Sequence, residues 1–266
     1  MSEADSTELV KYACEDNIAT ITLNRPNKLN AFDDDMVRHL GTALRRFDAD
    51  QDAWVAIICG AGRAFSSGAD VRQRQLRSRE EFERLGGPQA RDANAAALLT
   101  HMLNWKPVIA AVHGYVMGLA LGLAFECELV VAEAGTKFQL TETPRGLGGA
   151  RQWALMRFRG GTAFATEVSI TGRFFTAEEA MAGGLINRVT PAGKYLEAAR
   201  ELAREIAQIP PLSVRATVRT RRWYMDQIGR EISMQTAPLK LYLTEDFHEA
   251  ARAFAEKRPA GPFKGR

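Results

Sequence analysis

The stretch KPVIAAVHGYVMGLALGLAFECELVVA, Lys106–Ala132, decides the fold. It predicts a buried strand over Val108–Val112, a turn at His113-Gly114, an apolar helix that opens near Gly118, and a second β-rich run over Leu129–Val131. A strand that leads through a glycine turn into a helix start directs unpaired backbone N–H groups, and the positive end of the helix dipole, at one point. Such a point suits a reacting carbonyl oxygen that gains negative charge.

The composition is that of a soluble globular protein. The 266 residues are 46% hydrophobic and 25% charged, enough for one substantial core, and the net charge of +3 is too small to indicate a nucleic-acid partner. The three cysteines are widely spaced and odd in number, which indicates a reducing compartment, and the opening MSEADSTELV resembles no secretory signal. We therefore expect a cytoplasmic protein.

One segment resembles a membrane span. Pro107–Phe125 is nearly uncharged, but a proline, a histidine and three glycines interrupt it, and the acids Glu126 and Glu128 follow. It also divides into a strand-like half and a helix-like half. We predict that it does not cross a membrane.

The flanking sequence predicts an α/β fold. The strand Ile18–Asn24, a helix with Met36, Leu40, Leu44 and Phe47 on one face, and the strand Trp54–Cys59 form a βαβ unit, which favours parallel strands. Further segments are expected as follows: a charged helix or loop at Val71–Gln89, helices at Asp92–Leu103, Trp153–Phe158, Phe164–Ile170 and Thr176–Met181, strands at Lys137–Leu140 and Leu185–Val189, and helices at Lys194–Gln208, Leu212–Glu231, Ser233–Leu243 and Glu245–Lys257. We divide the chain into a βαβ-rich core, residues 1–190, and a helical C-terminal region, residues 191–266.

Two loops rich in small residues follow buried strands, where parallel sheets place ligands. Ala69, in Gly60–Asp70, and Leu119, after Gly118, would each offer a free backbone N–H. Two converging N–H groups form an oxyanion hole, in which each donor contributes about 3 kcal/mol at the transition state. The alternative is two ordinary tight turns, where glycine is common.

Other catalytic motifs do not fit. Gly60-Ala61-Gly62 lacks the third glycine of a dinucleotide fingerprint, and no phosphate loop or G-x-S-x-G elbow occurs. The four histidines lack metal-ligand spacing, so we predict no metal, and His113 is expected to be a packed turn residue rather than a base.

The chain resembles the crotonase superfamily, also called the enoyl-CoA hydratase/isomerase family. The matching stretches are NRPNKLNAF (24–32), GRAFSSGADV (62–71), KPVIAAVHGYVMG (106–118), TGRFFTAEEAMAGGLINRV (171–189) and FAEKRPAGPF (254–263). The resemblance implies a spiral core of ββα turns and a helical C-terminal region that mediates trimerisation, often within a hexamer built as a dimer of trimers. It also implies an acyl-CoA substrate, whose coenzyme A is part of the substrate, and no separate cofactor.

The resemblance also assigns site residues. Ala69 and Leu119 correspond to the positions whose N–H groups hold the thioester oxygen, and leucine at 119, where many members have glycine, would narrow the pocket. The substrate-binding positions are Arg25, Lys28 and Leu29 for the CoA nucleotide, Ser67, Gly68, Asp70 and Val71 along the adenine and pantetheine path, and Gly118 and Gly122 near the acyl group. These residues also have alternative, structural interpretations. Arg25 and Lys28 would fit an ordinary solvated turn, and Asp70 would fit a helix cap.

The acids depart from the family pattern. Typical hydratases use two glutamates for proton transfer; Glu142 corresponds to the second, but Gly122 stands at the first. Glu126 lies one turn further on the same face, and Glu128 falls where the family often has a structural acid. The segment after Glu142, Gly146–Ala150, is shorter than usual, and Arg145 and Arg151 beside it would bind a polar acyl group or, as we expect, form structural ion pairs.

The sequence therefore predicts hydration or double-bond isomerisation of an acyl-CoA thioester, with Glu142 as principal acid/base. The alternative is a non-catalytic acyl-CoA-binding or scaffold protein of the same fold, because Gly122 replaces an acid. An RNA-binding role for the basic cluster within 215–230 is less favoured, because a solvated helix or a trimer face also explains it.

Overall fold

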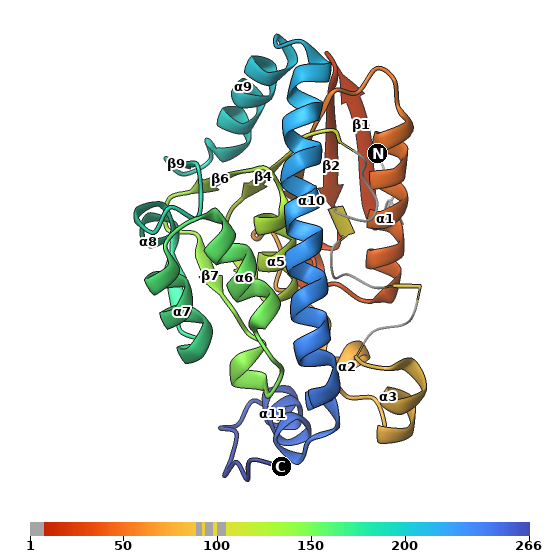
Figure 1. Cartoon of the computed structure of the whole chain (residues 1–266), viewed down its shortest axis with the longest axis vertical. Coiled ribbons are helices and arrows are strands. Elements are labelled where there is room, and N and C mark those ends of the chain that lie inside the picture. Colours follow the sequence, from red (N-terminus) through yellow and green to blue (C-terminus); the bar gives the residue numbers. More distant parts are fainter. Residues whose placement is uncertain (1–7, 89–91, 94–97, 100–104) are drawn as a thin grey trace, which may run out of the picture.

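In a computed structural model, which describes residues 8–88, 92–93, 98–99 and 105–266, a mostly parallel sheet forms the centre of the chain (Figure 1). Within these residues the sheet has six strands, in the order β1-β2-β3-β4-β6-β9. They are β1 (Val10–Glu15), β2 (Ile18–Leu23), β3 (Val55–Gly60), β4 (Val108–Val112), β6 (Leu129–Glu133) and β9 (Arg188–Thr190). Only the β1–β2 pair is antiparallel. The predicted α/β class and the strand Val108–Val112 are confirmed.

A smaller sheet stands beside the first and leads into the glycine-marked helix. Its strands are β5 (Tyr115–Met117), β7 (Lys137–Gln139) and β8 (Phe174–Thr176), with β5 parallel to β7 and β7 antiparallel to β8. β5 is not anticipated from the sequence, because three residues are too short to show a period. It separates the turn at His113-Gly114 from Gly118 and holds that glycine against the end of β7, where the Gly118 N–H donates to the Gln139 carbonyl at 2.9 Å.

Helices cover both faces of the large sheet and extend below it (Figure 1). They are α1 (Asp34–Ala49), α2 (Val71–Arg74), α3 (Arg79–Leu85), α5 (Leu119–Glu126), α6 (Ala150–Arg159), α7 (Thr162–Thr171), α8 (Ala177–Ala182), α9 (Tyr195–Ala207), α10 (Pro211–Thr236) and α11 (Glu245–Glu256). Short 3-10 turns are η1 (Pro26–Lys28), η2 (Thr143–Arg145), η3 (Ala237–Leu239) and η4 (Leu241–Leu243).

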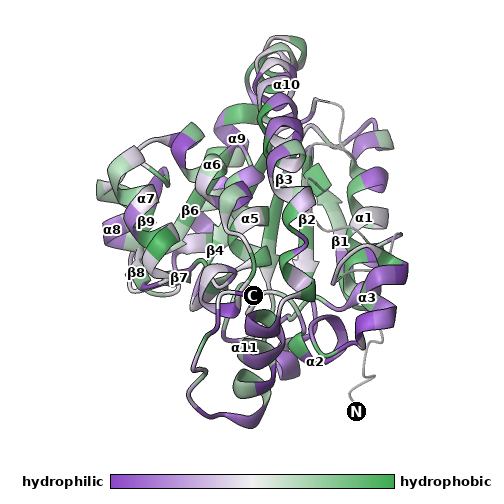
Figure 2. Cartoon of the chain, turned by 60° about the horizontal axis from the view of Figure 1, so that its bottom comes forward, coloured by the Kyte–Doolittle hydropathy of each residue, from purple (hydrophilic) through white to green (hydrophobic). Residues whose placement is uncertain are grey.

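The core lies on both faces of the large sheet, and its strands are the hydrophobic centre in Figure 2. On one face α1 and α5 pack against alternate strand residues such as Ile21 and Ile58; on the other, α9 packs Ala199 and Ala203 against Ile57 and Ile109. The division at residue 190 stays a prediction, and α9, beyond that boundary, packs directly on the sheet.

Several local expectations are corrected. The two helices expected over Leu212–Glu231 and Ser233–Leu243 are one helix, α10, followed by two 3-10 turns, because no proline interrupts the sequence between Pro211 and Pro238. The strand expected at Leu185–Val189 begins later, at Arg188. Val71–Gln89 contains the short helices α2 and α3, and the buried Phe82 anchors α3. Most of the helix expected at Asp92–Leu103 lies outside the described residues.

His113 is a packed turn residue, as predicted. Its ring is buried and stacks on Tyr195 of α9, with the ring centroids 4.6 Å apart. Its Nε2 lies 2.9 Å from the Gly62 carbonyl oxygen. In the part of the chain that the structure describes, no helix is both long and apolar enough to cross a membrane.

A buried carboxylate fixes α10 to the sheet. Glu128, between α5 and β6, accepts a hydrogen bond from the Val108 N–H at 2.9 Å and pairs with Arg221 at 3.2 Å and Arg222 at 2.9 Å. Arg222 is buried and also donates to the Lys106 carbonyl at 2.6 Å. This is the structural role that the resemblance implies for Glu128.

Removing this carboxylate should destabilise the protein strongly. Glu128→Ala leaves two buried or half-buried arginines without their partner, and we expect a loss of about 3–5 kcal/mol in the free energy of unfolding, measured with denaturant. The matched control is Glu167→Ala, which breaks the exposed Glu167–Arg173 pair and should cost about 1 kcal/mol or less. Equal losses in the two variants would contradict a special role for Glu128.

Candidate active site

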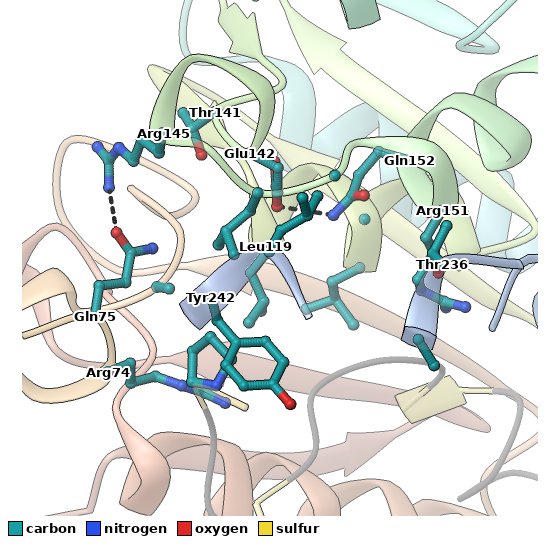
Figure 3. A pocket seen from close by; sticks show the side chains of 18 of the residues that line it. Arg74, Gln75, Leu119, Thr141, Glu142, Arg145, Arg151, Gln152, Thr236 and Tyr242 are labelled. Carbon is teal, nitrogen blue, oxygen red and sulfur yellow. Dashed lines mark hydrogen bonds between the residues drawn. The ribbon is translucent and has the colours of Figure 1, made fainter. Parts of the chain in front are cut away.

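One cavity of about 390 Å³ brings together the three predicted catalytic residues, Ala69, Leu119 and Glu142, with Ser67 and Gly122 of the predicted substrate-binding positions. Its lining comes from the loop after β3, α2, the start of α5, the segment after β7, α6 and the chain after α10 (Figure 3). The lining residues are Ser67, Ala69, Arg74, Gln75, Pro88, Leu119, Gly122, Leu123, Glu126, Thr141, Glu142, Arg145, Leu147, Gly148, Arg151, Gln152, Thr236, Ala237, Lys240, Leu241 and Tyr242. Arg74, Gln75 and Pro88, from the charged segment that follows Asp70, form one border of this cavity.

The loop that carries Ala69 is held by a buried asparagine. Asn30 Nδ2 donates to the carbonyls of Ala61, Ala64 and Phe65 at 2.9–3.1 Å, and its backbone carbonyl accepts from Ser66 Oγ at 2.8 Å. Phe32 pairs with this loop through the Gly68 carbonyl and the Asp70 N–H. The intervening Ala69 N–H donates to no acceptor among the described residues, so it is available to the cavity.

Leu119 brings a second free N–H to the same place. It is the first residue of α5, where a backbone N–H has no partner within the helix, and it has none elsewhere in the described chain. The two loops touch: a Cβ on Gly68 would lie 2.5 Å from the Met117 carbonyl oxygen and 3.6 Å from the Leu119 nitrogen. Glycine at 68, with φ +85°, permits this approach.

Glu142 lies directly against Gly118. A Cβ on Gly118 would meet Thr141 Oγ1 at 2.2 Å and the two Glu142 carboxylate oxygens at 3.3 and 3.5 Å. Burial raises the pKa of Glu142 to about 7, partly opposed by backbone hydrogen bonds and by Arg145. Although the residue as a whole is half-buried, Oε2 is shielded from solvent and has no hydrogen-bond partner among the residues that the structure describes. Such a carboxyl exchanges a proton readily near neutral pH.

Gln152 is a site residue that sequence reasoning missed. Its Nε2 donates to Glu142 Oε1 at 2.8 Å (Figure 3), and a Cβ on Gly122 would meet the same amide at 3.8 Å. The amide of α6 therefore fills the space beside Gly122. No spacing rule links residues 142 and 152, and only the short turn before α6 brings them together.

The remaining charged groups of the cavity have different partners. Glu126 is buried and forms an ion pair with Arg151 at 3.4 Å, which confirms the expected structural pairing of Arg151. The same expectation is wrong for Arg145, which forms no ion pair among the described residues and donates a long hydrogen bond of 3.5 Å to Gln75. All three side chains reach the cavity lining.

The predicted CoA-binding positions lie along the loops that lead to the cavity. Arg25 pairs with Asp33 at 3.1 Å and with Asp70 at 3.0 Å, and Asp70 also caps α2 by accepting from the Gln73 N–H. Lys28 is exposed, and Leu29 adopts a left-handed conformation with φ +50°. Of this set, Ser67 and Gly122 line the cavity, and Val71 is the buried first residue of α2. The CoA roles stay predictions.

The fold and the site together define a class: an α/β protein whose cavity holds the Glu142 carboxyl and two backbone N–H groups, of Ala69 and Leu119, that have no acceptor among the described residues. Residues 13–266 match the family model described as Enoyl-CoA hydratase/isomerase. The chain belongs to the enoyl-CoA hydratase/isomerase family, and it is a hydratase-like lyase.

The chain is similar to curated relatives and to solved structures over almost its whole length. The chain is 34% identical to (E)-benzylidenesuccinyl-CoA hydratase of Thauera aromatica, covering 96% of this chain and 99% of the relative, and 32% identical to 2,3-dehydroadipyl-CoA hydratase of Escherichia coli, covering 95% and 97%. Its structure is similar to that of carnitinyl-CoA hydratase from Mycobacterium avium, with a TM-score of 0.76, 31% identity, and coverage of 97% and 99%. The crotonase fold is thereby confirmed.

The raised pKa of Glu142 predicts a pH-dependent stability cost. The ordinary value of 4.5 applies to the unfolded chain and about 7 to the native state, so the native state binds more protons between these values and loses stability as the pH rises through them. Glu142→Gln keeps an acceptor for Gln152 and removes the charge. We expect it to increase the free energy of unfolding by about 1–3 kcal/mol near pH 8.5 and by little near pH 4.5.

Denaturant unfolding at the two pH values measures this difference. The control is Glu205→Gln on the exposed face of α9, which removes only the exposed pair with Arg188 and should change the free energy of unfolding by about 1 kcal/mol or less at either pH. A gain for Glu142→Gln that is the same at both values would refute the raised pKa.

Proposed function

We propose that this protein hydrates a 2-enoyl-CoA thioester, with Glu142 as the group that transfers the proton. The observation that carries the proposal is the position of the Glu142 carboxylate, whose oxygens would lie 3.3 and 3.5 Å from a Cβ on Gly118, the residue before Leu119. The family and relatives named as enoyl-CoA, benzylidenesuccinyl-CoA and dehydroadipyl-CoA hydratases support a hydratase acting on acyl-CoA.

Ala69 and Leu119 would form the oxyanion hole. Their N–H groups lack other acceptors in the described chain, and the contact of Gly68 with Met117 and Leu119 brings their loops together. A thioester oxygen between them would accept both hydrogen bonds as it gains charge, each contributing about 3 kcal/mol at the transition state. The enoyl C2=C3 bond then becomes open to nucleophilic addition at C3.

The proton chemistry would proceed through one carboxylate. Ionised Glu142 removes a proton from water while the water oxygen bonds to C3, and the electron pair of the double bond moves to the thioester oxygen as an enolate. Glu142 then returns the proton to C2, so one water has been added across C2=C3. Gln152, hydrogen-bonded to Glu142 at 2.8 Å, would orient the water in place of a second acid.

The exposed apolar side chains of α10 support the predicted trimer or hexamer. Trp223, Tyr224 and Met234 expose 56%, 54% and 71% of their surface in the single chain. Surfaces of this kind commonly mark an interface between copies of a chain.

The CoA moiety would approach the cavity past Lys28 and Ser67. Lys28 is exposed and Ser67 lines the cavity, and the CoA phosphates favour an exposed cation near the cavity loops.

Glu142→Gln tests the proposed function directly. Loss of the base should lower kcat/KM for crotonyl-CoA by about 10²–10⁴ without preventing folding. The measurement is the loss of the conjugated thioester absorbance, with Glu205→Gln as an exposed control expected to retain wild-type turnover. A matched assay with a 3-enoyl-CoA detects isomerisation as a rise in the same absorbance.

The outcomes separate the alternatives. Unchanged crotonyl-CoA hydration in Glu142→Gln removes Glu142 from the mechanism. If the wild type converts only the 3-enoyl thioester, the proposed function is isomerisation and not hydration. Binding of both thioesters by the wild type without turnover would favour the non-catalytic protein of the same fold.

Gln152→Leu tests the positioning of Glu142. The Gln152 N–H favours the ionised carboxylate, so its removal should raise the pKa of Glu142 and move the rise of kcat/KM with pH from about 7 to a higher pH. We expect kcat to fall by about tenfold and KM to change little. Gln208→Leu on the exposed end of α9 is the control. A lower kcat with an unmoved pH midpoint would argue against this role.

A further inference from the structure

Arg145 differs from Arg74 and Arg151, the other arginines of the cavity, in having no carboxylate partner in the described part of the chain. Arg74 lies 3.7 Å from a carboxylate oxygen of Asp34, and Arg151 pairs with Glu126 at 3.4 Å. Arg145 instead donates to the neutral Gln75 amide at 3.5 Å and lies 3.7 Å from the centroid of the Phe254 ring. Within the described chain no ion pair neutralises its charge.

The Arg145 side chain is also half-buried. Burial lowers the pKa of Arg145, and the Glu142 carboxylate opposes that change without forming an ion pair with it. A desolvated cation costs free energy unless an anion accompanies it. The four guanidinium N–H donors not used on Gln75 suit a carboxylate, which accepts two parallel hydrogen bonds from such a group.

The position of Arg145 is fixed relative to Glu142. Both belong to one tight turn, in which the Arg145 N–H donates to the Glu142 carbonyl at 3.1 Å and the Leu147 N–H donates to the same oxygen at 2.8 Å. Figure 3 shows the Arg145 guanidinium on the side toward Gln75, with Glu142 between it and Gln152. An anion bound to Arg145 would therefore lie at the end of the cavity beside Gln75, on the opposite side of Glu142 from Gln152.

We propose that the acyl group of the substrate carries a second, free carboxylate, which Arg145 binds. The substrate class is thus the mono-CoA thioester of a short unsaturated dicarboxylic acid, and this inference rests on the proposed hydratase function. Leu119, Leu123 and Leu147 line the same cavity and accommodate the carbon chain between the two ends. Arg145 acts as a specificity-determining residue, because it compensates the carboxylate that an apolar pocket would otherwise reject.

The phosphates of CoA are the other source of an anion, and the experiment distinguishes the two. The substrates are five- and six-carbon 2-enoyl-CoA thioesters, each prepared with a terminal methyl or a terminal carboxylate. In the wild type we expect kcat/KM to favour the carboxylate by roughly ten- to hundredfold for at least one chain length. At pH 9, where Glu142 is ionised with or without Arg145, Arg145→Gln should remove this preference and leave the methyl substrates within about threefold, whereas Arg145→Lys retains part of it.

The control variant is Arg72→Gln, an exposed arginine of α2 outside the cavity lining, which should change neither substrate. Equal or lower activity on the carboxylate at both lengths overturns the proposal. An equal loss on both substrate types in Arg145→Gln also overturns it and assigns Arg145 to the CoA phosphates or to catalysis.

Direct binding separates this result from failure of the proposed function. Calorimetric titration with saturated glutaryl-CoA and valeryl-CoA needs no turnover. Tighter binding of glutaryl-CoA that Arg145→Gln abolishes supports carboxylate recognition even if no enoyl thioester is hydrated. Equal affinities for the two thioesters overturn it even if hydration is observed.

Discussion

The site depends on one close contact, between the Cα of Gly118 and the turn at Thr141–Glu142. Any side chain at 118 would overlap Thr141 Oγ1 at 2.2 Å, and the residue needs φ +49°, which glycine adopts without strain. The contact holds the end of β5, the start of α5 and the end of β7 together. As a result the free N–H of Leu119 and the carboxylate of Glu142, which are 23 positions apart in the sequence, face the same cavity.

The electrostatics of the cavity follow from how its charges are distributed. Glu126 and Arg151 neutralise each other, and Glu142 is bound by a neutral amide rather than by a cation. A second carboxylate at position 122 would disfavour ionisation of Glu142, since like charges raise each other's pKa. Glycine there, with Gln152 filling the space beside it, leaves one carboxyl whose pKa of about 7 is set mainly by burial.

One wall of the cavity is formed by the end of α10 and the residues that follow it, and α10 is held to the sheet at a point remote from Glu142. Glu128 ties Arg221 and Arg222 to the start of β4, near the middle of the helix. The helix then continues to Thr236, and Thr236, Ala237, Lys240, Leu241 and Tyr242 complete the cavity lining (Figure 3). The fit of this wall therefore depends on an ion-pair cluster in the core, because a 26-residue helix transmits its placement along its length.

The sequence by itself determined the parallel α/β core, the strand–turn–helix at Lys106–Ala132, and the position of Glu142 after a short strand. These features are local: a run of buried β-branched residues, glycines at fixed places, and family motifs in order. It also determined that His113 packs rather than reacts.

Only the tertiary structure decided the partners of the charged and polar groups. Gln152 meets Glu142 across a turn, and Arg151 rather than Arg145 pairs with Glu126. The short strand β5 lies between the turn at His113-Gly114 and the helix that begins after Gly118. The sequence also did not predict that α10 is one continuous helix. Partner choice depends on distances between segments remote in the chain, and residue identity alone fixes only which partners are chemically possible.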